Sequence, residues 1–363
     1  MEILSPNFTP ILLNVALFLS AMSGVVLVVI TVVHWRSVRQ NKHTTAFRKA
    51  AEPLITGYLE GHTTEERVIE TMQQDLAEAI SLLMTYSLKL EPAMRSRLQP
   101  LFCNLLSIDT EVSALKSKNI KRRLQATERL AYFNNGVSEK ALLDTLKDDV
   151  LAVRFSAAHS LASHGETKTI EPILLSFNNQ KEIHWQRLVE VFLDYGPSAA
   201  PTVLAILANS NRKYTTDITS VMIRVLGTFL TPEAVQPLIN LLDNPDPNIR
   251  LNAAHALGEI GDPVANAAVA ELSNDPSWRV RNEAVEAMSG LHADKQIPML
   301  SNALTDSSWR VRLSSAQALH SLGQPGITKL EEVMKNTTDR DAREICRQVL
   351  EEHEVLDTKK KQS

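Results

Sequence analysis

Two stretches in the last third of the chain are almost the same: DPSWRVRNEAVEAMSGL at residues 275–291 and DSSWRVRLSSAQALHSL at residues 306–322. Their starting positions, 275 and 306, define a repeat period of thirty-one. A fixed period of this length is typical of solenoids, in which each short unit buries its apolar face only by stacking on its neighbours. The repeat therefore predicts an extended array of small units instead of one globular core.

The same period continues through much of the chain. An arginine recurs at this period in two series, Arg123 and Arg154, then Arg250, Arg281, Arg312 and Arg343. Glycines hold the matching place at unit ends, where a helix would finish in a left-handed cap: Gly165, Gly196, Gly261 and Gly323. The interval between Gly196 and Leu230 is longer than the period, which predicts an insertion near residues 209–216.

Each unit of the array is expected to be a pair of helices. A short apolar segment, such as PEAVQPLINLL at residues 232–242, precedes a turn and a longer segment that opens with Val-Arg. Small residues in the longer segment, such as Ala253 and Ala284, let neighbouring helices approach closely. Aromatic residues are only 5% of the chain and glycines number 12, which disfavours sheets and their turns. We expect an all-α fold, with the repeat array over residues 111–350.

These units resemble HEAT repeats, in particular the short bacterial repeats that include the phycobilisome-lyase-like form. The resemblance is carried by a D-x-x-x-x-V-R spacing, as in DPSWRVR at residues 275–281, and by an A-x-x-x-L-G ending, as in ALHSLG at residues 318–323. It implies a HEAT-type α-solenoid, which is a right-handed superhelix of helix pairs.

In the HEAT family a turn aspartate and an arginine early in the second helix form a ladder between neighbouring units. The resemblance implies this role for three matched pairs, Asp148 with Arg154, Asp275 with Arg281, and Asp306 with Arg312. It also implies the role for Arg250 and Arg343, although Asn244 and Thr337 hold the aspartate place before them. The unit around residues 185–196 lacks the arginine.

The N-terminal region carries a long apolar run. Residues 11–33 contain no charged side chain over 23 positions, which is enough helix to cross about 30 Å of hydrocarbon. A cleaved signal peptide is the competing interpretation, but the first ten residues hold Glu2 and no Lys or Arg, and the run is too long for a signal sequence. The run is therefore predicted to be a transmembrane helix that precedes the solenoid.

Basic residues lie only on the C-terminal side of this run: Arg36, Arg39, Lys42, Arg48 and Lys49. Positive flanks stay cytoplasmic. The prediction is a single-pass protein of the cell (inner) membrane with residues 1–10 outside and the repeats in the cytoplasm. Residues 34–110 then form a basic juxtamembrane segment with irregular helical pairs, and residues 351–363 a disordered tail.

Two tryptophan–arginine pairs open the second helices of adjacent units, Trp278 with Arg279 and Trp309 with Arg310. These arginines precede the Val-Arg pair and should point away from the ladder. Trp and Arg are the side chains most enriched at binding hot spots, so the pairs are candidate partner-binding residues. The tryptophans could equally cover the seam between units.

Further polar columns are expected on the outward face of the second helices. One column includes Asn252 and Glu283, and the next includes His255, Glu286 and Gln317. In superhelical repeats this face often receives an extended partner. A solvated face would show the same mixture of residues, so both interpretations stay open.

Sequence signals for catalysis are weak. The ten histidines are scattered, Cys103 and Cys346 are far apart, and no phosphate-binding loop, zinc spacing or nucleophile elbow is present. The net charge of −4 gives no reason to expect nucleic acid. We expect a non-enzymatic scaffold without a cofactor or metal, which binds a membrane-associated protein partner, for example in a biosynthesis or export complex. The alternative is a bilin-lyase-like or other small-molecule enzyme on a HEAT scaffold.

Overall fold

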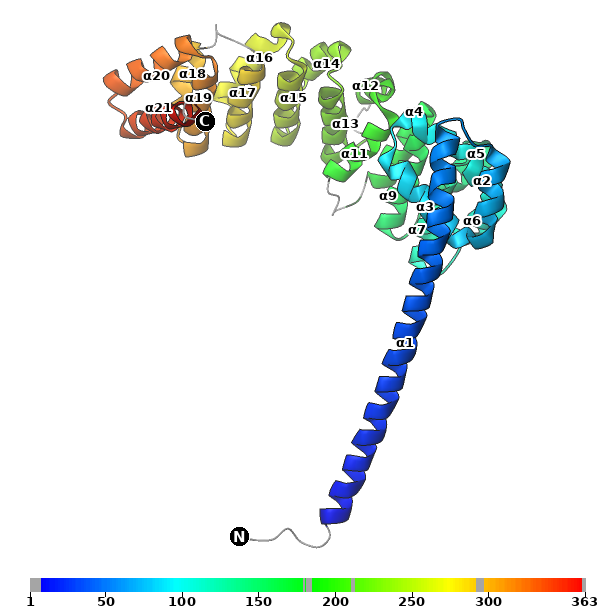
Figure 1. Ribbon diagram of the computed structural model, residues 1–363. Coiled ribbons are helices and arrows are strands. Elements are labelled where there is room, and N and C mark those ends of the chain that lie inside the picture. The colour runs from blue at the N-terminus through cyan, green and yellow to red at the C-terminus, as the bar shows by residue number, and fades with distance from the viewer. Residues whose placement is uncertain (1–7, 179, 181–184, 210–212, 292–296, 361–363) are drawn as a thin grey trace, which may run out of the picture. The chain divides into compact units, whose positions relative to one another are not determined.

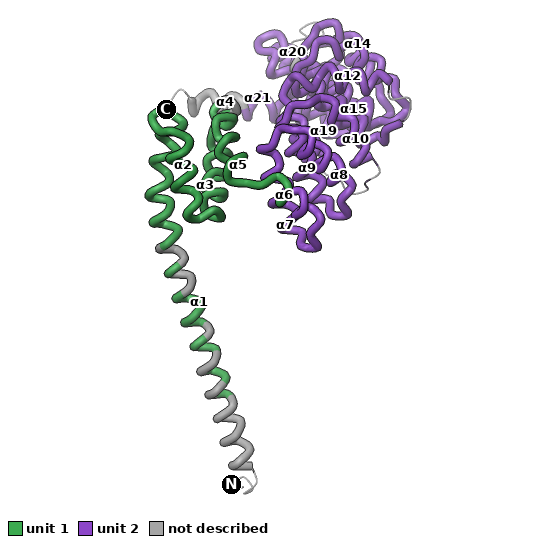
Figure 2. Tube along the Cα trace, turned by 90° about the vertical axis from the view of Figure 1, so that its right-hand side faces the viewer, with its two compact units in different colours: residues 1–111 green, residues 112–363 purple. Residues whose placement is uncertain are grey.

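The computed structural model describes residues 8–178, 180, 185–209, 213–291 and 297–360, and these residues form helices and turns without a strand. They divide into two compact units, Met1–Glu111 and Val112–Ser363 (Figure 2). The all-α fold is thus confirmed over the described residues.

The first unit consists of one long helix and shorter helices packed on its C-terminal part. Helix α1 (Phe8–Leu59) is followed by α2 (Glu65–Met72), α3 (Leu76–Lys89), α4 (Pro92–Arg95) and α5 (Gln99–Leu105). Helix α1 packs against α2 and α3, and both of these pack against α5. The fully buried core side chains include Ile55, Val68, Leu83 and Phe102. An ion pair between Arg48 Nε and Glu78 Oε1, 2.6 Å apart, joins α1 to α3.

The N-terminal part of α1 exposes apolar side chains. Leu27, Ile30 and Val33 are 68%, 61% and 60% exposed. Within the predicted span, the side chains of residues 11–18 lie outside the described part of the chain, as do residues 1–7 of the predicted outer segment. Among described residues, no single helix combines the length and hydropathy that a membrane crossing needs. The one helix pair that does so together, Trp185–Tyr195 with Pro197–Ala208, is bent by 100°.

The second unit is a two-row array of helix pairs (Figure 1). One row contains the second helix of each pair: α7 (Ile120–Leu130), α9 (Leu151–Ser163), α11 (Trp185–Tyr195), α13 (Thr216–Thr228), α15 (Pro247–Ile260), α17 (Trp278–Gly290), α19 (Trp309–Ser321) and α21 (Arg340–Lys360). Each helix of this row packs on the next. The other row contains the first helices: α8 (Gly136–Thr145), α10 (Ile170–Phe177), α12 (Ala200–Ala208), α14 (Val235–Asn240), α16 (Asn266–Glu271), α18 (Ile297–Ala303) and α20 (Gln324–Asn336). Helix α6 (Ile108–Ala114) leads into the array.

Close packing within the second-helix row depends on two glycines that are one repeat period apart. A Cβ added to Gly227 of α13 would meet Ala256 Cα at 2.8 Å, and one added to Gly258 of α15 would meet Ala287 Cα at the same distance. Real Cβ atoms do not approach backbone this closely, so glycine sets how near α13, α15 and α17 lie.

The predicted helix-end glycines all have positive φ, which suits a residue without Cβ. The angles are +74° at Gly165, +69° at Gly196, +73° at Gly261 and +72° at Gly323. Leu230 holds the same place in its unit with φ of +48°. A leucine in this region is strained.

The predicted insertion falls between α12, which ends at Ala208, and α13, which begins at Thr216. Asn178, the residue after α10, fastens the end of this connection: its Oδ1 accepts from Thr215 N at 2.8 Å and its Nδ2 donates to Lys213 O at 3.0 Å. Residues 210–212 lie outside the described part.

Helix α21 runs to Lys360, so residues 351–360 of the predicted tail lie in its helical backbone. The sequence there, EEHEVLDTKK, contains the helix-forming residues Glu and Lys. Residues 361–363 lie outside the described residues.

Candidate functional site

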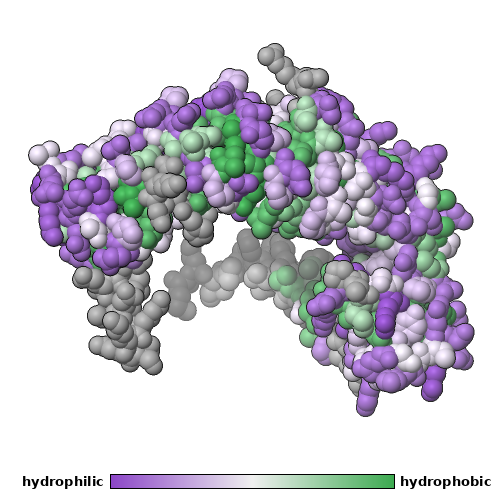
Figure 3. Space-filling view, turned by 90° about the horizontal axis from the view of Figure 1, so that it is seen from above, coloured by the Kyte–Doolittle hydropathy of each residue, from purple (hydrophilic) through white to green (hydrophobic). Residues whose placement is uncertain are grey.

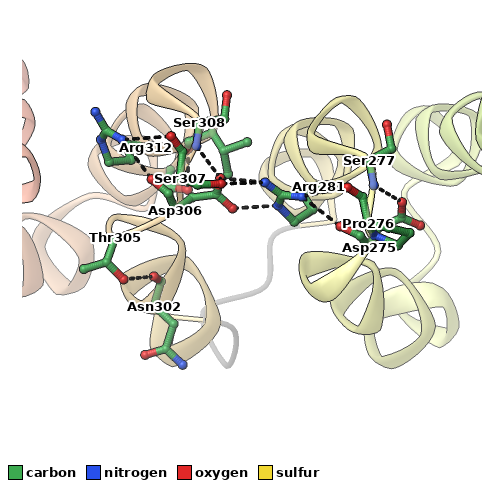
Figure 4. A network of polar contacts seen from close by, with 12 residues as sticks. Asp275, Pro276, Ser277, Arg281, Asn302, Thr305, Asp306, Ser307, Ser308 and Arg312 are labelled. Carbon is green, nitrogen blue, oxygen red and sulfur yellow. Dashed lines mark hydrogen bonds and ion pairs between the residues drawn. The ribbon is translucent and has the colours of Figure 1, made fainter.

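The arginine ladder joins each unit to the next one along the chain. Arg281 of α17 forms two hydrogen bonds with Asp306, from Nε to Oδ2 at 2.7 Å and from Nη2 to Oδ1 at 2.8 Å (Figure 4). Its Nη1 donates to the main-chain carbonyl of Asp275 at 2.8 Å. One guanidinium therefore ties the turn of its own unit to the aspartate of the next.

The same geometry corrects the predicted pairing. Asp275 was matched with Arg281, but its carboxylate binds Arg250, with Nε to Oδ2 at 2.7 Å. Asp306 likewise binds Arg281 instead of Arg312, whose Nη2 lies 2.9 Å from Asp341. The motif shows which residues take part, but spacing within one unit does not show which unit's carboxylate the long side chain reaches.

Two of the predicted ladder arginines depart from this arrangement. Asp148 is bound by Arg123, with Nε to Oδ2 at 2.8 Å, so its predicted pairing with Arg154 is wrong. Arg154 instead donates to Gln180 Oε1 at 3.1 Å and to Ser176 O at 3.4 Å. Arg343 donates to the carbonyl of Thr337, and it has no carboxylate partner among the described residues.

The ladder aspartates are held ionised by their partners. Burial raises the pKa of Asp275, but hydrogen bonds from Arg250 and from the N–H of Ser277 outweigh it, so the pKa lies below its usual value. Burial also acts on Asp306, and bonds from Arg281 and the N–H of Ser308 again lower its pKa. These carboxylates are committed to the fold and are not open to a partner.

The ladder is interrupted in the middle of the array, and a different cluster occurs there. Trp185 of α11 stands one repeat period after Arg154, in the arginine place of its unit. The Arg224 guanidinium of α13 lies over the Trp185 ring, 4.1 Å from its centroid. Arg224 Nη1 also donates to Asn252 Oδ1 of α15 at 3.1 Å. Burial lowers the pKa of Arg224.

This cluster continues through His255 into the next helix. His255 Nδ1 lies 2.7 Å from Glu283 Oε1 of α17, and its Nε2 lies 3.5 Å from Glu259 Oε1. The hydrogen bond to Glu283 raises the pKa of His255 in spite of its burial. Asn252, His255 and Glu283, which were predicted to face outward, are thus half-buried. His255 is bonded to Glu283, and Asn252 is bonded to Arg224. We call Trp185, Arg224, Asn252, His255 and Glu283 the central cluster.

The remaining predicted column residues are exposed. Glu286 of α17 accepts a hydrogen bond from Asn282 Nδ2 at 2.7 Å and one from Ser314 Oγ at 3.4 Å. Gln317 of α19 is exposed at the matching place one unit later. These side chains face solvent, so they are available to a partner, whereas the central cluster is largely occupied by its own contacts.

The doubled tryptophan–arginine forms one continuous stack across two units. The Arg310 guanidinium lies 5.1 Å from the ring centroid of Trp278 and 5.5 Å from that of Trp309. Trp278 is 37% exposed and Trp309 57%. An exposed cation–π contact contributes about 0.5–1 kcal/mol. The tryptophans therefore do cover the seam in part, yet both keep large exposed surfaces. We call Trp278, Arg279, Trp309 and Arg310 the Trp–Arg edge.

Two residues of the central cluster were not predicted as site residues. Arg224 lies one repeat period before His255, in the column that continues through Glu286 and Gln317. Trp185 occupies a place where the repeat pattern requires arginine. The departure from the period was the available signal for Trp185, and extending the column by one unit would have found Arg224.

On the face seen from above, apolar groups of the described residues reach the surface in separate patches between polar ones (Figure 3). Among those residues, no group of three or more His, Cys, Asp or Glu side chains is placed to hold a metal ion.

Residues 200–289 and 265–351 match the sequence model of HEAT repeats. No curated protein matches the chain. A crystal structure of importin beta is similar in fold, with 12% identity and a TM-score of 0.51, over 85% of this chain and 48% of the importin chain. The present chain thus spans about half the length of that solenoid. The repeat match and this likeness show a HEAT-type solenoid fold.

Two shorter solved structures are also similar. The complex of CpcE and CpcF of phycocyanin lyase from Nostoc is 21% identical, over 42% of this chain and 98% of that one, with a TM-score of 0.33. Human deoxyhypusine hydroxylase is 20% identical, over 80% of this chain and 97% of that one, with a TM-score of 0.30.

Proposed function

We propose that this chain is a non-enzymatic scaffold that binds a protein partner through the exposed side of its second helices. The Trp–Arg edge carries the proposal. It presents two exposed tryptophan rings with an arginine between them, at the same place in adjacent units. Large aromatic side chains and arginine provide most of the binding energy at protein interfaces, and a solenoid offers its partner an extended surface.

Exposed neighbours of the edge extend this surface. Glu286 and Gln317 are exposed on the same two helices, α17 and α19. Arg279 and Glu286 are spaced i and i+7, so they share one face of α17. Glu283 lies between them but is already bonded to His255 of the central cluster.

We also propose that residues 11–33 anchor the chain in the cell inner membrane, with the N-terminus outside and the repeats in the cytoplasm. Support comes from the uncharged run, from the basic residues that follow it, and from the apolar side chains that α1 exposes around Leu27 and Ile30. The partner would then be membrane-associated. A reporter that is active only in the cytoplasm should be active when it is fused after Ser363. If a reporter that is active only outside the cytoplasm works there instead, the proposed orientation is wrong.

The test of the scaffold function is partner recovery from membranes. The tagged full-length chain would be extracted in a non-ionic detergent, and the bound proteins compared between wild type and the double variant Arg279→Glu, Arg310→Glu. We expect one discrete partner to be lost from the variant. Thermal unfolding of the same samples should shift only slightly, since Arg310→Glu removes two exposed cation–π contacts of about 0.5–1 kcal/mol each and Arg279→Glu removes none.

Lys121→Glu is the matched control. Lys121 occupies the place of Arg279 and Arg310 in the first helix of the row, α7, and is exposed, but Ile120 stands there instead of tryptophan. It should leave recovery intact. If wild type and the double variant recover the partner equally, the Trp–Arg edge does not bind it. A double variant that melts well below wild type would make its arginines structural.

A further inference from the structure

The charges of the Trp–Arg edge are not neutralised by its surroundings. Neither Arg279 nor Arg310 has a hydrogen bond or an ion pair within the described part of the chain, and both are exposed. Within the described part of the chain, Arg310 makes cation–π contacts with the rings of Trp278 and Trp309 instead. Two guanidinium groups, each with five N–H donors, are therefore free to bind acceptors.

The nearby turn carboxylates cannot supply those acceptors. Asp275 is held by Arg250, Asp306 by Arg281 and Asp341 by Arg312. The ladder thus binds Asp275 and Asp306, which precede α17 and α19, and Asp341 in the first turn of α21. As a result, the edge keeps a local positive charge on a chain whose net charge is −4.

We propose that the Trp–Arg edge binds a short acidic segment of the protein partner, with its carboxylates on Arg279 and Arg310 and its apolar side chains on Trp278 and Trp309. Guanidinium groups bind carboxylates through paired, charge-assisted hydrogen bonds. Stacking between two rings holds the Arg310 guanidinium in place before the partner arrives, which lowers the entropy lost on binding. This inference rests on the proposed scaffold function and specifies the partner's chemistry.

The charge pattern along the helices favours an acidic peptide over a nucleic acid. Beyond the two arginines, Glu286 on α17 and Glu259 on α15 are exposed, and Glu283 is bonded to His255. A long phosphate backbone that follows these helices would meet the carboxylates, and its affinity depends on neutralising many phosphates. A short segment in which a few carboxylates alternate with apolar side chains needs only the two arginines and the two tryptophans.

Binding of labelled probes to the full-length chain in non-ionic detergent tests this inference. The probes are an octapeptide of alternating glutamate and leucine, its counterpart with lysine in place of glutamate, and an oligothymidine of eight nucleotides, each followed by fluorescence anisotropy. We expect the glutamate peptide to bind, more weakly at high salt, and the other two not to bind. The double variant Arg279→Glu, Arg310→Glu should lower the affinity for the glutamate peptide by at least about tenfold. Lys121→Glu should leave that affinity unchanged.

Three outcomes would overturn the inference: no binding of the glutamate peptide, equal binding of the lysine peptide, or tighter binding of oligothymidine that the double variant abolishes. The scaffold function can be tested separately from the acidic chemistry of the partner. If partner recovery from membranes still depends on Arg279 and Arg310 while the glutamate peptide fails to bind, only the acidic chemistry is wrong. If recovery does not depend on them, the proposed function fails as well.

Discussion

Arg281 and Asp306 lie in adjacent units and are joined by two hydrogen bonds, 2.7 and 2.8 Å long. The side chains are only 14% and 10% exposed. The contact recurs between Arg250 and Asp275 and between Arg123 and Asp148, so the repeat period is preserved by a bond between units as well as by apolar packing.

Replacing Arg281 by alanine should weaken one junction of the array. Asp306, whose side chain is only 10% exposed, would lose its bidentate partner. The loss of hydrogen bonds to a charged group costs about 1.5–3 kcal/mol. Because units contact only their neighbours, hydrogen exchange should rise mainly in α17, α18 and α19. Lys121→Ala, at an exposed site, is the control. A uniform rise in exchange from Val112 onward would contradict the local picture.

Stability should depend on pH through His255. Its folded pKa is raised by Glu283, so the pair contributes stability that is complete below the ordinary histidine value of about 6.5 and is lost as pH rises through the folded pKa. Denaturant unfolding of wild type should therefore give a free energy that declines above about pH 6.5. Glu283→Gln should flatten this part of the profile. An unchanged slope in that variant would show that another group titrates.

Leu230→Gly should stabilise the protein. Leucine at a φ of +48° is strained, and Gly261, one repeat period later, takes the left-handed conformation at the equivalent place. The left-handed region costs a non-glycine residue about 1–2 kcal/mol, offset in part by the greater freedom of glycine when unfolded. Leu230 is 57% exposed, so little burial is lost. The reverse change, Gly261→Leu, should lower the melting temperature, and a lower melting temperature for Leu230→Gly would contradict the account.

Gly258→Ala should destabilise the array, because the new Cβ would overlap Ala287 Cα of α17. Overpacking of this kind costs about 1–3 kcal/mol. Gly136→Ala is the matched control: no atom lies within 4 Å of a Cβ built there. Equal melting temperatures for the two variants would show that α15 and α17 can separate without cost.

The period of the sequence was enough to predict the helix pairs, the positive-φ glycines and most residues of the ladder. It did not predict that Arg281 reaches forward to Asp306, because the direction of a long side chain depends on how the units stack. The half-buried state of Glu283 was not predicted for the same reason. Whether this side chain faces solvent or bonds to His255 of the preceding helix depends on how the units stack. Gly227 and Gly258 lie inside helices, where the pattern marks no turn, and only the helix spacing shows why they are glycines.

The predicted site residues fall into two groups for a physical reason. Asn252, His255 and Glu283 lie in the middle of their helices, where the neighbouring helix approaches closely and supplies polar partners. Trp278 and Trp309 open their helices, where side chains extend beyond the packed row. The outward direction of Arg279 and Arg310 could be predicted from their place before the Val-Arg pair, whereas the exposure of the tryptophans and the bonding at the helix centres required the structure.

Photocrosslinking in intact membranes tests the central claim most directly. A photoreactive amino acid would replace Gln317, Glu286 or, as the control in α7, Lys121. The account predicts that positions 286 and 317 both crosslink to the same single protein and that position 121 does not. Crosslinks to that protein from position 121 alone, or none from positions 286 and 317, would contradict it.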